Sequence, residues 1–138
     1  MTAPISAGLM GGFLMAMLLG HAYLTAGNEM TQAPFRRLVL MLVVLLVLRT
    51  IVSGIFGILP WLAVPAHAGL TRMWTVVMIV GRYGVGLIVP GVFAYMIYDC
   101  VNRRANQSAT GILYVATVLV ILGEGMGFAL LGSTGFVF

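Results

Sequence analysis

Four long apolar segments, separated by short polar stretches, dominate the pattern of this chain. They lie at about residues 5–26, 38–59, 73–98 and 111–132. Each is long enough for an α-helix to cross the hydrocarbon of a bilayer, which takes about 20 residues. Because the connections are short, consecutive helices should be antiparallel neighbours. The pattern predicts an all-α integral membrane protein, a four-helix bundle that forms one transmembrane domain over residues 1–138.

The composition agrees with a membrane protein. Hydrophobic residues make up 62% of the chain and charged residues only 7%, with a mean hydropathy of +1.13. Soluble domains carry about 25% charged residues. The net charge of +4 does not indicate a nucleic-acid partner, because the arginines stand in pairs beside apolar segments or singly inside them. Membrane lipids are the partner that this pattern predicts.

The arginines also predict the orientation of the chain. Arg36 and Arg37 lie in the first connection and Arg103 and Arg104 in the third, whereas Arg72 is the one arginine of the second. The positive-inside rule places the first and third connections in the cytoplasm. Both termini and the second connection are then expected on the non-cytoplasmic side.

Small residues recur at every fourth position in two of the helices, a spacing that lets helix backbones approach closely. We interpret these stripes first as contacts within the bundle, with docking against another subunit as the alternative. The residues are Gly8, Gly12, Ala16 and Gly20 in the first helix, and Gly123 and Gly127 in the fourth.

The third helix contains Pro90 among several glycines. Proline lacks a backbone N–H, and its ring crowds the carbonyl of the residue four positions earlier, here Gly86. A kink is therefore expected near Pro90. We interpret it as a packing feature, with the opening of a ligand pocket as the alternative.

One carboxylate, Glu124, stands in the middle of the fourth apolar segment between Gly123 and Gly125. A charge at that depth costs roughly 2.5–3.5 kcal/mol and needs a partner. At the rise of an α-helix, Glu124, Arg82 and Arg49 lie within about 6 Å of the same depth. Arg82 and Glu124, on consecutive antiparallel helices, are the expected ion pair.

The charges at this depth do not balance. The other two acidic residues are Glu29, in the first connection, and Asp99, near the inner end of the third helix. Two arginines and one carboxylate leave a net charge of +1, and arginine keeps its proton. The charge of Arg49 can be accommodated in three ways. Arg49 shares Glu124 and leans on backbone carbonyls, it meets an acid of another subunit, or it binds an electron-rich ligand such as a quinone carbonyl, a haem propionate or a lipid phosphate.

Histidines and motifs predict little chemistry within the chain. His21 and His67 lie at opposite depths, so a haem held by both is not expected. We interpret His21 as a neutral side chain hydrogen-bonded in the bundle, with a proton-transfer, quinone or haem-ligand role as the alternative. Neither a metal site nor a catalytic residue is predicted, because the chain has one cysteine, Cys100, and no phosphate loop, nucleophile elbow, HExxH motif or paired catalytic carboxylates.

The fourth helix carries Gly123-Glu124, then Gly127-Phe128 and Leu130-Leu131. This resembles a pattern in quinone-reactive membrane anchor subunits of the dimethyl sulfoxide reductase and polysulfide reductase type. Their helices often carry Gly-Glu, then Gly-Arg, then an apolar aromatic tail. Here Phe128 stands in place of the arginine, and the chain is about half as long as those anchors. The resemblance implies a membrane subunit near a quinone or haem in an electron-transfer complex.

These observations lead to one main hypothesis and one alternative. The chain is expected to be an accessory or anchor subunit of a larger respiratory or photosynthetic complex in the bacterial cytoplasmic (inner) membrane. Other membrane proteins would be its partners, and Arg49, Arg82 and Glu124 would compensate charge or frame a quinone, haem, pigment or lipid. In the alternative, a small transporter or proton-coupled carrier, Glu124 would titrate and the third helix would move.

Overall fold

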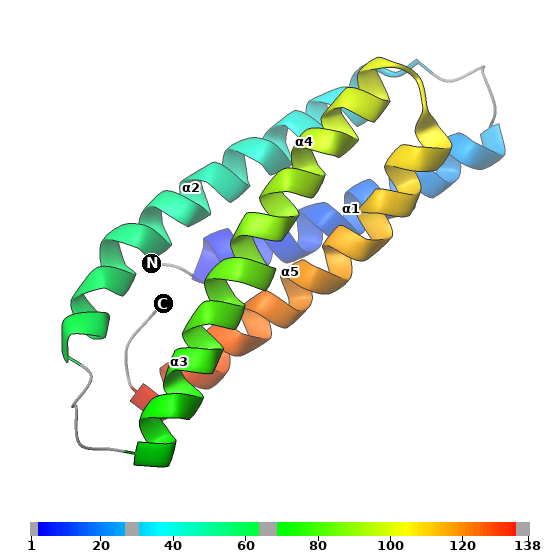
Figure 1. Cartoon of the computed structure of the whole chain (residues 1–138). Coiled ribbons are helices and arrows are strands. Elements are labelled where there is room, and N and C mark those ends of the chain that lie inside the picture. The colour runs from blue at the N-terminus through cyan, green and yellow to red at the C-terminus, as the bar shows by residue number, and fades with distance from the viewer. Residues whose placement is uncertain (1–2, 27–30, 64–68, 135–138) are drawn as a thin grey trace.

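The computed structural model describes residues 3–26, 31–63 and 69–134, and side chains within 3–26, 31–55 and 73–132. This part of the chain is almost entirely helical. The elements are α1 (Ala3–Ala26), α2 (Ala33–Ala63), α3 (Gly69–Tyr83), the π-helix η2 (Gly84–Ile88), α4 (Val89–Asn102) and α5 (Asn106–Thr134). Because α3, η2 and α4 follow one another without a break, the described chain forms four rods (Figure 1).

Each of the four rods contains a stretch long and apolar enough to cross a membrane, as predicted. The helices extend beyond the apolar segments, most clearly where α2 begins at Ala33 and α5 at Asn106. Hydropathy marks the part of a helix that suits hydrocarbon, whereas backbone hydrogen bonding continues into the polar flanks. Arg36 and Arg37 consequently lie in the first turns of α2 and not in a loop.

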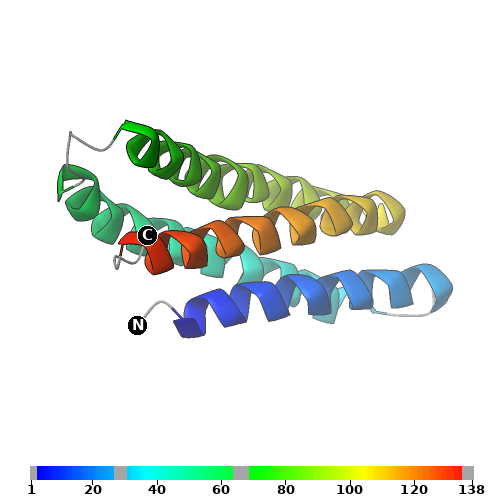
Figure 2. The ribbon, with the colours of Figure 1, turned by 90° about the horizontal axis from the view of Figure 1, so that it is seen from below.

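The rods pack as an antiparallel bundle. α1 contacts α2 and α5, α4 contacts α2 and α5, and α3 contacts α5. The end of α1 and the start of α2 lie beside the connection between α4 and α5, while the start of α1 and the end of α5 lie at the opposite end (Figures 1 and 2). α2 and α5 are therefore diagonal to each other.

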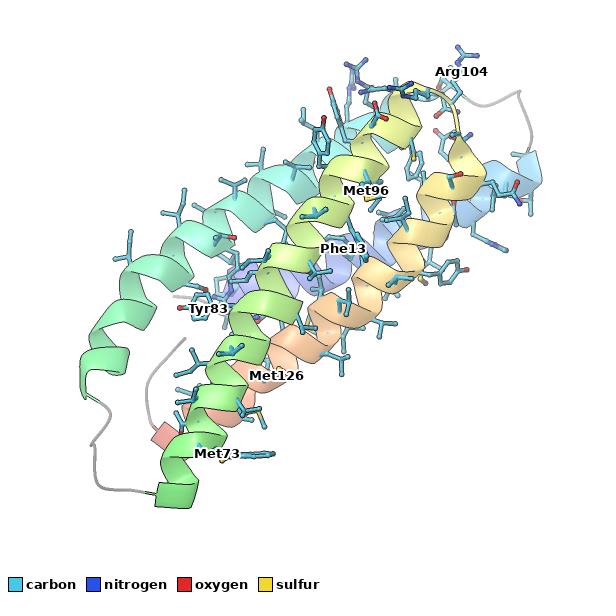
Figure 3. The ribbon with its side chains drawn as sticks, viewed as in Figure 1. Phe13, Met73, Tyr83, Met96, Arg104 and Met126 are labelled. Atoms are coloured by element: carbon cyan, nitrogen blue, oxygen red, sulfur yellow. The ribbon has the colours of Figure 1, made fainter. Side chains whose placement is uncertain are left out.

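An apolar core fills the half of the bundle nearer the connections α1–α2 and α4–α5. Phe13 and Ala16 from α1 and Leu113 and Ala116 from α5 have no exposed surface, and Phe13 points between the helices in Figure 3. Large apolar residues also cover the outside, as expected for a surface in contact with lipid. Examples are Met15, Met41, Met73 and Tyr95, each more than 60% exposed.

The small residues of α1 are used inside this bundle. A β-carbon on Gly12 would lie 2.6 Å from Cδ2 of Leu42 in α2, and one on Gly20 would lie 2.8 Å from Oγ1 of Thr110 in α5. Ala16, between them, is fully buried. Gly8 is less confined, since a β-carbon there would be 3.9 Å from Leu45. The stripe thus lets α1 lie close to both neighbours.

α1 lies beside only part of the length of α2. Gly8 lies beside Leu45 and Gly12 beside Leu42, so the first residue of α1, Ala3, is level with about residue 50 of α2. α2 continues to Ala63, about 20 Å further at the rise of an α-helix. The level of Arg49 is therefore the level at which α1 begins.

The backbones of η2 and α5 touch at a pair of glycines. A β-carbon on Gly123 would lie 2.2 Å from Cα of Gly86, and one on Gly86 would lie 2.6 Å from Cα of Gly123. Only glycine fits at either position without separating the two helices. This contact holds the helix that carries Arg82 against the helix that carries Glu124.

The distortion predicted near Pro90 is a π-helical segment, not a sharp kink. The N–H of Val89 donates to the carbonyl of Gly84, five residues earlier, and the rod keeps its direction through η2 (Figure 1). The wider turn takes the backbone out of α-helical register just before the proline, which has no N–H of its own. The strain is absorbed by a change of hydrogen-bond pattern and not by bending.

α4 ends in a Schellman motif with an unusual residue at its left-handed position. The N–H of Arg104 donates to the carbonyl of Val101, and that of Ala105 donates to Cys100, at 3.1 and 2.9 Å. Arg104 has a φ of 59°. Glycine usually occupies this position, because a β-carbon in the left-handed conformation costs about 1–2 kcal/mol. Arg104 therefore stands where helix termination by itself would favour glycine.

Replacing Gly123 with alanine should destabilise the bundle by about 1–3 kcal/mol, the usual cost of overpacking. The added methyl group would meet backbone that cannot rotate away. Gly125→Ala is the matched control, since a β-carbon there meets nothing within 4 Å. Unfolding of both variants in mixed detergent micelles measures the difference, and equal stabilities would contradict the close contact.

Arg104→Gly should raise the free energy of unfolding by about 0.5–1 kcal/mol, because glycine relieves the left-handed strain but loses more chain entropy on folding. Arg104→Ala removes the same charge and keeps the β-carbon, so it should bring no such gain. The two midpoints of unfolding, measured side by side, separate backbone strain from charge. A gain in both variants would assign the effect to charge.

A buried arginine–glutamate–arginine cluster as the candidate functional site

Three charged side chains from three rods meet inside the bundle. Glu124 comes from the middle of α5, Arg82 from the last turn of α3 and Arg49 from α2. Their exposed fractions are 3%, 0% and 3%. All three lie at one level, as their predicted depths indicated.

Glu124 receives one hydrogen bond on each carboxylate oxygen. Nη2 of Arg82 donates to Oε1 at 2.9 Å, and Nη2 of Arg49 donates to Oε2 at 3.2 Å. Arg82 reaches Glu124 from the neighbouring rod, whereas Arg49 reaches it from the diagonal one. Such charge-assisted hydrogen bonds are stronger than neutral ones, particularly where water is excluded. Of the three solutions open to Arg49, the structure shows the sharing of Glu124 but, among the described residues, no hydrogen bond from Nε or Nη1 of Arg49 to a backbone carbonyl.

Glycines make room for the Arg82 side chain. A β-carbon on Gly127 would lie 3.2 Å from Nε of Arg82, and one on Gly86 would lie 3.4 Å from Nη1. A guanidinium group is wide and flat, and here it lies against backbone without side chains between. Gly86 and Gly123 hold the two helices close, while Gly127 leaves space for the charge. These contacts account for Gly123 and Gly127 beside Glu124, whereas Gly125 faces open space.

Tyr83 and Ser53 extend the cluster and were not predicted. The hydroxyl of Tyr83 donates to the backbone carbonyl of Ser53 at 2.6 Å, which joins α3 to α2 (Figure 3). Ser53 is 2% exposed and stands one helical turn after Arg49. That i, i+4 spacing, and the position of Tyr83 next to Arg82, were the available signals in the sequence.

The cluster keeps a net charge of +1 and has spare donors. Each arginine uses one of its three nitrogens for Glu124. Within the described part of the chain, Nε and Nη1 of Arg49, Nε and Nη1 of Arg82 and Oγ of Ser53 are buried without a hydrogen-bond partner. Both carboxylate oxygens accept a hydrogen bond, whereas four of the six guanidinium nitrogens have no partner among the described residues. The arrangement suits an electron-rich or anionic group better than a positive one.

The remaining candidates do not join the cluster. His21 is exposed on the outside of α1, at the level of Phe35 in α2, so the interpretation of His21 as a side chain inside the bundle is wrong. Asp99 binds Arg103 at 2.9 Å on the surface and does not compensate the buried charge. His67 and Glu29 lie outside the described residues.

The cluster also does not resemble a metal site. Among the described residues, no three His, Cys, Asp or Glu side chains gather where they could hold a metal ion. Guanidinium groups have no lone pair to offer a cation.

No protein-family model, curated protein or solved structure matches the chain. The resemblance of α5 to quinone-reactive anchors therefore stays a prediction.

Glu124→Gln should destabilise the bundle by about 3–5 kcal/mol, because it keeps the shape of the side chain but leaves two buried guanidinium groups without a counter-charge. Arg49→Met should cost clearly less, since Arg82 and Glu124 remain as a neutral pair. Both variants remove the Arg49–Glu124 ion pair, but only Glu124→Gln also removes the Arg82–Glu124 pair and leaves two unpaired guanidinium groups. Similar losses of unfolding free energy in the two variants would show that the charge balance does not matter.

Proposed function

We propose that this chain is an accessory or anchor transmembrane subunit of a larger membrane complex. The observation that carries this proposal is the buried cluster of Arg49, Arg82 and Glu124, whose charge is not balanced within the described chain. We infer that a partner subunit, or a ligand held between this chain and that subunit, supplies the group that compensates it.

The surface available to partners supports the same role. The connection between α4 and α5 comprises only residues 103–105, and the rods are apolar on their outer faces. Contacts with other proteins would therefore form mainly inside the bilayer, between helices. Such contacts rely on close packing and on occasional polar pairs.

The core argues against the carrier alternative. A solute or proton passing along the bundle from Glu124 towards the α4–α5 connection would meet a closely packed apolar core. The core residues with no exposed surface include Phe13, Ala16, Leu113 and Ala116. A carrier that protonates Glu124 would also have to release two ion pairs in each cycle. The accessory role requires neither movement.

The narrower proposal is an electron-transfer complex of the bacterial cytoplasmic membrane. It rests on the resemblance of the Gly123-Glu124 pattern to quinone-reactive anchors. The arginine that would follow Gly127 in that pattern is missing, but this chain brings two guanidinium groups to Glu124 from α2 and α3. A quinone carbonyl, a haem propionate, a pigment or a lipid phosphate would be a suitable acceptor for their spare N–H groups.

The proposed orientation follows from the arginine pairs. Arg36, Arg37, Arg103 and Arg104 are all exposed, and the two helix ends that carry them lie at the same end of the bundle (Figure 1). By the positive-inside rule that end faces the cytoplasm. Both termini would then lie on the non-cytoplasmic side.

Native electrophoresis of the protein, extracted from its own membranes in mild detergent, tests the proposal. We expect the chain to migrate with redox subunits in a large assembly, and mass spectrometry of the band identifies them. Glu124→Gln should reduce the fraction in that assembly, whereas Gly125→Ala, one residue away and facing outward, should not. An absorption spectrum of the band reports a bound haem or pigment.

Two results would contradict the proposal. Migration as a single chain or a small homo-oligomer would show that the chain is not part of a larger complex. A large assembly without redox subunits would support the accessory role and contradict the narrower proposal of electron transfer. In the first case, loss of solute flux in Glu124→Gln would favour the carrier.

A further inference from the structure

An apolar groove opens on the outer surface of α1 and α2. It is lined by Gly12 of α1 and by six residues of α2 between Leu38 and Leu45, and its volume is about 370 Å³. All of its lining surface is apolar. Along α2 it extends about 10 Å at the rise of an α-helix, so it is elongated parallel to the helices.

A basic residue, Arg37, lies one helical turn before the groove residue Met41. Arg37 is exposed and precedes Met41 by four residues and Val44 by seven, a spacing that places the three on one face of α2. Met41 and Val44 belong to the groove. Arg37 therefore lies on the face of α2 that carries Met41 and Val44, at the end of the groove nearer the start of α2.

Three more arginines strengthen the positive field at this end. Arg36 lies with its guanidinium carbon 6.0 Å from the centre of the Tyr98 ring, which ties the start of α2 to α4. Arg103 and Arg104 follow at the end of α4, and Arg104 is labelled there in Figure 3. Among the described residues of this end, Asp99 is the acidic one, bound to Arg103. Four arginines and one aspartate leave a formal charge of +3 among the described residues, and Glu29, which the sequence places in the α1–α2 connection outside them, makes it +2.

The position of Arg104 indicates that positive charge at this end has a use, which includes the proposed orientation. It occupies the left-handed position of a Schellman motif, where glycine would end the helix with less strain. The chain contains 18 glycines, yet an arginine stands at this position. Helix termination does not account for it, whereas a requirement for positive charge at this end does.

We propose that this groove and Arg37 together bind an anionic phospholipid. One acyl chain lies in the groove, and the phosphate meets Arg37 within the field of Arg36, Arg103 and Arg104. Guanidinium groups pair well with phosphate oxygens. A zwitterionic headgroup carries its own ammonium, so the net positive charge of this end favours a headgroup with net negative charge. The occupant has to be both apolar and anionic, and of the components of a bilayer an anionic lipid has both properties.

The test uses the purified full-length chain in detergent, titrated with phosphatidylglycerol or phosphatidylcholine of the same acyl chains. Native mass spectrometry counts the lipids retained. We expect tighter binding of phosphatidylglycerol. Arg37→Gln should weaken it about fivefold, the factor expected for one basic residue near an anionic surface, and should leave phosphatidylcholine unchanged. Arg37→Lys, which keeps the charge, should retain most of the preference.

A second pair of variants tests the groove. Val44→Trp fills it and should weaken the binding of both lipids. Val77→Trp adds the same bulk to another exposed position, on α3, and should weaken neither. Midpoints of thermal unfolding, measured without added lipid, show that each variant is folded.

The proposal is overturned by equal retention of the two lipids in the unchanged protein, or by an Arg37→Gln variant that keeps the preference for phosphatidylglycerol. Inorganic phosphate and phosphatidylglycerol could raise the midpoint of thermal unfolding by the same amount. Such a result would point to a free anion as the ligand and would also overturn the proposal. If Val44→Trp and Val77→Trp behave alike, the groove is not the acyl-chain site. These outcomes do not depend on membership in a larger complex, because the chain is tested by itself.

Discussion

The carboxylate of Glu124, held between two guanidinium groups in hydrocarbon, is the interaction on which the rest of the structure depends. It joins α5 to the neighbouring α3 and to the diagonal α2. Hydrocarbon provides no water to solvate any of the three charges, so each needs the others. The glycine pair Gly86 and Gly123 and the opening at Gly127 follow from this need, because the helices have to lie close for the charges to meet.

The two halves of the bundle are held together by different means. Near the exposed arginines, apolar side chains such as Phe13 and Leu113 fill the centre. Lipid tails are as apolar as these side chains, so close packing and not exclusion of water holds this half. Towards the start of α1, the centre is polar and the ion pairs take over. Specific chemistry is therefore concentrated at one level of an otherwise apolar bundle.

Charge has a different use at each level. Arg49 and Arg82 are buried, hold Glu124 and keep spare donors, which favours a role in an assembly that supplies an acceptor. Arg36, Arg37, Arg103 and Arg104 are exposed at one end, beside an apolar groove, which favours contact with the headgroups of the bilayer. Both sets use arginine, the one basic residue type in the chain, whose planar group offers several donors to oxygen atoms.

The sequence by itself determined the four apolar helices, their antiparallel order and the shared depth of Arg49, Arg82 and Glu124. Length and hydropathy suffice for the first two, and helical rise for the third. Only the tertiary structure decided that Arg49 shares Glu124, that Tyr83 and Ser53 join the cluster, that Gly12 and Gly20 face α2 and α5, and that His21 points outward. A helix that is apolar on all sides carries no amphipathic pattern to set its rotation about its own axis. Which residues face inward is settled by packing: glycines meet where backbones touch, and the charges turn towards one another.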